Sequence, residues 1–145
     1  MKLTIAQALK QKNKLAFKLQ KNWGRIHTYN SAVVASYRPF NVEDLLQETI
    51  KITQELVELK TKIHQASAPV REKIFRLSEL KSAMQQITSI STKEGKIRER
   101  YDNQVVEMEA IITAARVDVL SEQFEQEIDQ IQELLEVFNH KTYLS

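Results

Sequence analysis

Apolar residues recur at every third or fourth position along one stretch of the chain, residues 42–63. The steps alternate between three and four through Val42, Leu45, Thr49, Ile52, Leu56, Leu59 and Ile63. This spacing places the residues on one side of a helix, in a stripe that can pack lengthwise against another helix. Asn41 is a suitable helix cap, and two acids follow it in the first turn. The pattern predicts a helix over 42–65.

Three further helices are expected. One covers 4–27, where Thr4 and Gln7 form a capping-box pattern. Another covers 70–90, and its short connection through Pro69 predicts a hairpin with 42–65. The last covers 118–138, capped by Asp118 or Ser121 and followed by a tail. The apolar stripe of the first helix is Ile5, Leu9, Ala16, Leu19, Trp23 and Ile26.

Two segments lose the helical pattern. Residues 28–40 contain several good strand residues, and 105–117 fits a helix and a strand about equally well. We favour an extended segment over 105–116 that pairs with 32–37, and a solvated loop around 89–100. The fold class is therefore mainly α, an antiparallel helical bundle or coiled-coil hairpin of about four helices, with a minor two-stranded β element left open. The length suggests a single helical domain over 1–145.

Composition excludes several kinds of chemistry. Two glycines and two prolines favour long helices over sheets with many tight turns, and the absence of cysteine removes disulfides and thiolate sites. No stretch approaches about 20 consecutive apolar residues, so no membrane span is predicted. The first residues do not resemble a signal peptide. We expect a cytoplasmic protein.

Charge is distributed unevenly along the chain. The net charge is +2, but residues 1–40 contain eight basic side chains and no acid. Residues 118–145, in contrast, contain seven acidic side chains and one basic side chain, Lys141. The first helix carries a basic stripe: Lys10, Lys14, Lys18, Lys21 and Arg25. This stripe is a candidate contact for nucleic-acid phosphates or anionic lipid. The favoured alternative is that it meets the acidic helix 118–138, within the chain or across a dimer.

The sequence contains no motif typical of a reactive site. His27, His64 and His140 lie far apart and form no metal-binding pair, and the two glycines cannot make a phosphate loop. Glu107 and Glu109 would point the same way on a strand, where an outward polar edge is the favoured interpretation. We predict no catalytic residues, no cofactor, no metal and no small-molecule substrate, and hence no enzyme.

Four segments resemble a family of uncharacterised bacterial proteins, some of them called septicolysin-like. The opening MKLTIAQALK is similar to the family's MKLAEAL pattern, and LVELKTKIHQASA (56–68) occupies the place of a helix that ends in an I-N-x-T-N-like motif. Residues 117–119 precede the final helix as in the family, and 139–144 is similar to a terminal N-W-x-T-x-L signature, with His140 in place of the Trp. The resemblance implies no established activity and no catalytic residues.

Two functions follow as expectations. The stripes on several long helices favour a structural or interaction protein that forms a homo-oligomer through helical packing. The alternative is a weak, sequence-independent nucleic-acid binder that uses the basic first helix.

Overall fold

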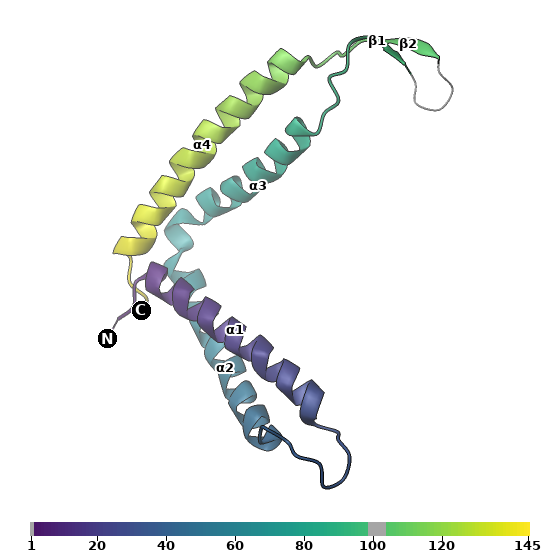
Figure 1. Ribbon diagram of the computed structural model, residues 1–145. Helices are drawn as coiled ribbons and strands as arrows, with labels where there is room; N and C mark the ends of the chain where they lie inside the picture. Colours follow the sequence, from purple (N-terminus) through teal and green to yellow (C-terminus); the bar gives the residue numbers. More distant parts are fainter. Residues whose placement is uncertain (1, 99–103) are drawn as a thin grey trace. The chain divides into compact units, whose positions relative to one another are not determined.

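A computed structural model describes residues 2–98 and 104–145 of the chain. It contains the helices α1 (Ile5–Tyr29), α2 (Val42–Ala66), α3 (Arg71–Thr88) and α4 (Ala114–Lys141) and the short 3-10 helix η1 (Ala68–Val70). The strands β1 (Gly95–Arg98) and β2 (Val105–Met108) pair antiparallel (Figure 1). The predicted fold class, mainly α with a minor two-stranded β element, is confirmed.

The contacts of the chain divide it into two compact units, which are described separately. Unit 1 comprises Met1–Val70 and Glu136–Ser145, and unit 2 comprises Arg71–Leu135. The expected single domain over 1–145 stays a prediction.

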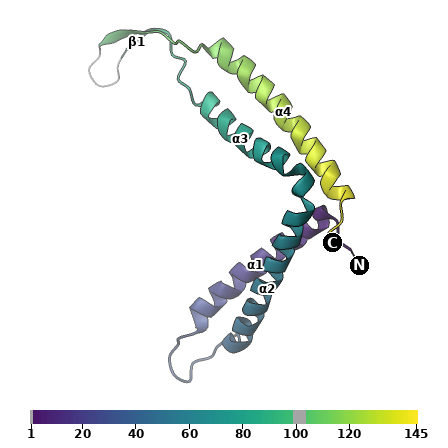
Figure 2. The ribbon, with the colours of Figure 1, turned by 180° about the vertical axis from the view of Figure 1, so that it is seen from behind.

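Unit 1 is built on a hairpin of α1 and α2, which lie side by side in both views (Figures 1 and 2). Both predicted caps are present. The side chains of Thr4 and Gln7 bond each other's backbone N–H groups, and Asn41 accepts from the backbone N–H of Asp44. The residues that α1 and α2 turn toward each other again step by three and four. These interface residues are Ile5, Ala8, Lys12, Leu15, Leu19, Asn22 and Ile26 on α1, and Leu45, Thr49, Ile52, Leu56, Leu59 and Ile63 on α2.

Residues 142–144 belong to the tail that the sequence predicts after the last helix, and they are bonded to the start of the chain. The backbone N–H of Ile5 donates to the carbonyl of Thr142 at 2.8 Å, and that of Leu144 donates to the carbonyl of Leu3 at 2.8 Å. These bonds bring Leu144 into the core of unit 1, where it is buried against Ile5, Ala8 and Leu59. The segment therefore closes one end of the hairpin core.

In unit 2, α3 packs on α4 through a core of Leu80, Ile128 and Ile131. The guanidinium of Arg76 pairs with the carboxylate of Glu127 beside this core. The helix α4 begins at Ala114, earlier than predicted. The hydroxyl of Thr113 accepts from the backbone N–H of Arg116 at 3.3 Å, so Thr113 takes the capping role expected of Asp118 or Ser121.

One predicted pairing is wrong, and another stays a prediction. Within unit 1 the long partner of α2 is α1, and within unit 2 α3 packs on α4. The predicted hairpin of 42–65 with 70–90 would join the two units and stays a prediction. Strand β2 lies where an extended segment was expected, but its partner is β1, with Gly95 opposite Met108, and not 32–37. A helix that matches 3/4 spacing fits any partner with the same spacing, so the pattern did not identify the neighbour.

Candidate interaction surface

Polar groups lie inside the hairpin of unit 1. Asn22 on α1 is 3% exposed and Thr49 on α2 is fully buried. The side-chain amide of Asn22 donates to Glu48 at 3.4 Å, and the ammonium of Lys18 pairs with the other oxygen of the same carboxylate at 2.5 Å. The hydrogen bond from Lys18 is the largest cause that lowers the pKa of Glu48, and partial loss of water acts against it. A polar network of Lys18, Asn22 and Glu48 therefore links α1 to α2.

The two faces of this hairpin follow from the interface residues. Consecutive residues of a helix differ by about 100° in direction, so the residue before and the residue after an interface position lie on opposite sides of it. Because α1 and α2 run antiparallel, the preceding positions of both helices share one face and the following positions share the other. Lys18 and Glu48, which both precede an interface residue, are in contact as this geometry requires.

The face formed by the preceding positions is charged, and we call it the charged face. It carries Gln11, Lys14, Lys18, Lys21 and Arg25 on α1, and Asp44, Glu48, Lys51, Glu55, Glu58 and Lys62 on α2. The row of cations on α1 thus runs beside a row on α2 that is mostly acidic. The basic stripe therefore has acidic neighbours on α2, and Lys18 forms an ion pair with one of them, Glu48.

Four of the five predicted contact residues lie on the charged face, and Lys10 lies next to it on α1. Lys10, Lys14 and Lys21 are exposed and make no ion pair with any residue in 2–98 or 104–145. Lys18 is held by Glu48, and the guanidinium of Arg25 stacks over the ring of Phe40 at 4.2 Å from its centroid. Three of the five cations therefore remain directed to solvent.

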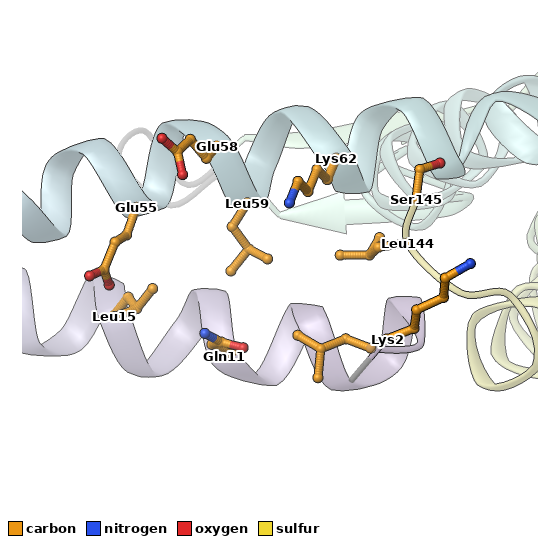
Figure 3. A pocket seen from close by; sticks show the side chains of 10 residues that line it. Lys2, Gln11, Leu15, Glu55, Glu58, Leu59, Lys62, Leu144 and Ser145 are labelled. Carbon is orange, nitrogen blue, oxygen red and sulfur yellow. The ribbon is translucent and has the colours of Figure 1, made fainter.

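A shallow pocket of about 280 Å³ opens on the charged face (Figure 3). Its apolar lining comes from Leu3, Leu15, Leu59 and Leu144, and its polar lining from Lys2, Gln11, Glu55, Glu58, Lys62 and Ser145. Figure 3 shows Glu55 and Leu59 extending from α2 toward α1. Two ammonium and two carboxylate side chains line the pocket, so these side chains give it no strong preference for a ligand of either sign.

The face formed by the following positions is different, and we call it the apolar face. It carries Leu9, Asn13, Ala16, Gln20, Trp23 and His27 on α1, and Leu46, Ile50, Thr53, Val57, Lys60 and His64 on α2. It includes one ammonium group and no carboxylate. Ile50, Val57 and Trp23 are 58%, 55% and 39% exposed. The sequence did not predict this face, because its 3/4 pattern assigned Leu9, Ala16 and Trp23 to the interface itself.

Carboxylates also gather in unit 2. Glu94, Glu107 and Glu109 line one open depression beside the β ribbon. Among residues 2–98 and 104–145, however, no group of three or more His, Asp or Glu side chains is arranged to hold a metal ion.

Comparisons with known proteins extend the description of the fold. The chain is similar to a crystal structure of a functionally unknown conserved protein from Corynebacterium diphtheriae, with a TM-score of 0.76 and 15% identity over the whole length of both chains. This likeness supports the fold alone. No model of a protein family matches the sequence, and no curated protein matches it. The septicolysin-like resemblance and the absence of enzymatic activity stay predictions.

Hydropathy of the helices bears on membrane topology. In the described residues, no helix combines the length and the apolar character needed to span a bilayer.

Proposed function

We propose that the protein is a helical interaction module that self-associates through the apolar face of unit 1. The observation that supports this is the exposure of Trp23, Ile50 and Val57 on a face without carboxylates. A hairpin of two helices buries only the interface between them and leaves both of its faces in water. Two such hairpins can pack as four helices, and each then buries one of its faces. A second copy of the same hairpin supplies the missing layer.

A second copy fits this face better than an unrelated partner would. A two-fold interface brings each patch onto itself, so a self-complementary patch must be free of strong like-charge repulsion. The apolar face meets this condition apart from Lys60. The charged face is disfavoured for a different reason, because burying its rows of ions would carry a large desolvation cost. The expected assembly is a dimer whose apolar faces meet in a four-helix arrangement.

The mass in solution tests the proposal. Size-exclusion chromatography with light scattering should give twice the chain mass of 16.9 kDa for the unmodified protein. Val57→Glu places a carboxylate at the centre of the apolar face and should return the mass to that of one chain. Gln47→Glu adds the same charge on the solvent side of α2 and should leave the dimer intact. A mass of one chain at the highest attainable concentration would refute self-association.

Nucleic-acid binding is the second candidate, and the exposure of Lys10, Lys14 and Lys21 favours it. The exposed ring of Phe17 lies between these lysines on the same side of α1, so a stacking group accompanies the cations. The acids of α2 on the charged face oppose this function by repelling phosphates. The candidate requires salt-sensitive binding of a single-stranded oligonucleotide that weakens when all three lysines are changed to Gln. Equal binding by that triple variant would exclude it.

A further inference from the structure

The segment that joins α1 to α2 carries an apolar tip. Residues 31–39 are all exposed, and Val33, Val34 and Tyr37 are 79%, 93% and 87% exposed. Both ribbon views show this segment continuing past the ends of the two helices (Figures 1 and 2). Folding ordinarily covers valines and tyrosines at least in part, so three such exposed side chains within five residues indicate a contact surface.

The tip has a defined backbone. The backbone N–H of Ser36 donates to the carbonyl of Val33 at 3.0 Å, and the Ser36 hydroxyl donates to the same oxygen at 2.6 Å. Ala35 has a φ of 67°, a value typical of the third residue of a type II turn and unfavourable for a residue with a Cβ. This turn places Val34 at its apex.

The base of the segment is fixed to α1. The guanidinium of Arg38 donates to the carbonyl of Tyr29 at 2.9 Å, so it occupies an acceptor at the C-terminal end of the helix. The ring of Phe40 contacts both the guanidinium of Arg25, at 4.2 Å from its centroid, and the ring of Tyr29, at 5.7 Å between centroids. The apolar tip is therefore presented on an anchored, cationic base.

The positive charge around the base of this segment indicates an anionic partner. Residues 1–40 carry eight basic side chains and no acid, and the nearest acids in the sequence, Glu43 and Asp44, stand in the first turn of α2. Aliphatic side chains at the apex have no partner on a phosphate backbone, whereas they enter the acyl region of a bilayer while cations stay with the headgroups. Tyrosine is favoured at that boundary.

We propose that residues 32–38 form a wedge that docks unit 1 on an anionic lipid surface. Val33 and Val34 enter the bilayer interface, Tyr37 lies at the headgroup level, and Arg38 and Arg25 remain among the lipid phosphates. The wedge is separate from the apolar face, so this proposal does not depend on self-association.

Vesicle sedimentation with the full-length protein tests the wedge. The unmodified protein should pellet with vesicles of mixed phosphatidylcholine and phosphatidylglycerol, and much less with phosphatidylcholine alone. The double variant V33S/V34S should weaken retention by roughly tenfold or more, because both apolar side chains leave the interface. Val119→Ser removes an equally apolar exposed valine from α4 and serves as the matched control.

Fluorescence gives an independent measurement of insertion. The variant W23F/V34W carries its single tryptophan at the apex of the tip. Its emission should shift to the blue with the anionic vesicles, and brominated lipids should quench it. The proposal is overturned if V33S/V34S is retained as well as the unmodified protein, or if the emission of W23F/V34W is unchanged by the vesicles. Loss of oligonucleotide binding by V33S/V34S, with vesicle retention intact, would assign the tip to nucleic acid instead.

Discussion

Two polar side chains, Asn22 and Thr49, occupy buried positions in unit 1. Asn22 is satisfied through the carboxylate of Glu48, while the hydroxyl of Thr49 has no hydrogen-bond partner among the described residues. A buried amide in a helical interface disfavours other registers, since any shift would leave it without its partner. The 3/4 spacing identified Thr49 as an interface residue, because apolar residues lie four positions before it and three positions after it. It did not identify Asn22, because the stripe predicted for the first helix ran through Trp23 instead.

Replacing Thr49 with Val should stabilise the protein. The change keeps the shape of the side chain and removes a buried hydroxyl that lacks a partner among the described residues, so the free energy of unfolding should rise by roughly 1 kcal/mol. Urea denaturation at fixed protein concentration measures this change. Thr61→Val is the matched control, because Thr61 is exposed, lies on neither face, and its hydroxyl already donates to the carbonyl of Val57. A loss of stability in Thr49→Val would show that the buried hydroxyl is bonded.

The ion pair of Glu48 predicts a dependence of stability on pH. Its pKa is lowered from 4.5 in the folded chain, chiefly by the hydrogen bond from Lys18, so the folded state favours the carboxylate. The stabilisation is then present above pH 4.5 and is lost as the pH falls through the lowered pKa. A double-mutant cycle of Glu48→Gln and Lys18→Gln, followed by urea denaturation, should show coupling at neutral pH that disappears in acid. Coupling that is equal in acid would contradict this assignment.

At the scale of elements, local signals in the sequence located the helices well. Thr4 and Asn41 cap α1 and α2 as predicted, since a capping residue acts on N–H groups only two or three positions away. Partners were not predictable in the same way. The strands β1 and β2 have four residues each, too few for a periodic pattern, and β1 fell in a segment whose mixed charges indicated a loop.

The C-terminal segment shows how a contact between distant residues escapes a local pattern. Leu144 lies almost the whole chain length from Ile5, whose side chain it meets in the core of unit 1. Leu144→Ala should lower the free energy of unfolding by about 3 kcal/mol, because it leaves a cavity beside Ile5 and Leu59. Tyr143→Ala is the control, since that side chain is exposed and its loss should cost about 0.5 kcal/mol or less. Equal losses in the two variants would show that Leu144 is not part of the core.

At the scale of the whole molecule, the placement of charge separates three kinds of surface on unit 1. The charged face balances cations of α1 against acids of α2, the apolar face avoids carboxylates, and the wedge places aliphatic side chains beside arginines. The net charge of +2 conceals this arrangement. The face on which a residue lies depends on which helix pairs with which, so the apolar face is defined by the pairing of α1 with α2 and not by the sequence of either helix alone.

Trp23 lies on the apolar face and is the single tryptophan of the chain, so it reports directly on the proposed dimer. Self-association removes its indole from water, and dilution should therefore shift its emission to the red and increase its quenching by iodide. The melting temperature should rise with protein concentration, since mass action stabilises the assembled state. Val57→Glu should show red-shifted emission and a melting temperature independent of concentration, while Gln47→Glu should behave as the unmodified protein. If the emission of the unmodified protein stays constant on dilution while light scattering detects a change from dimer to monomer, then the protein dimerises through a surface other than the apolar face.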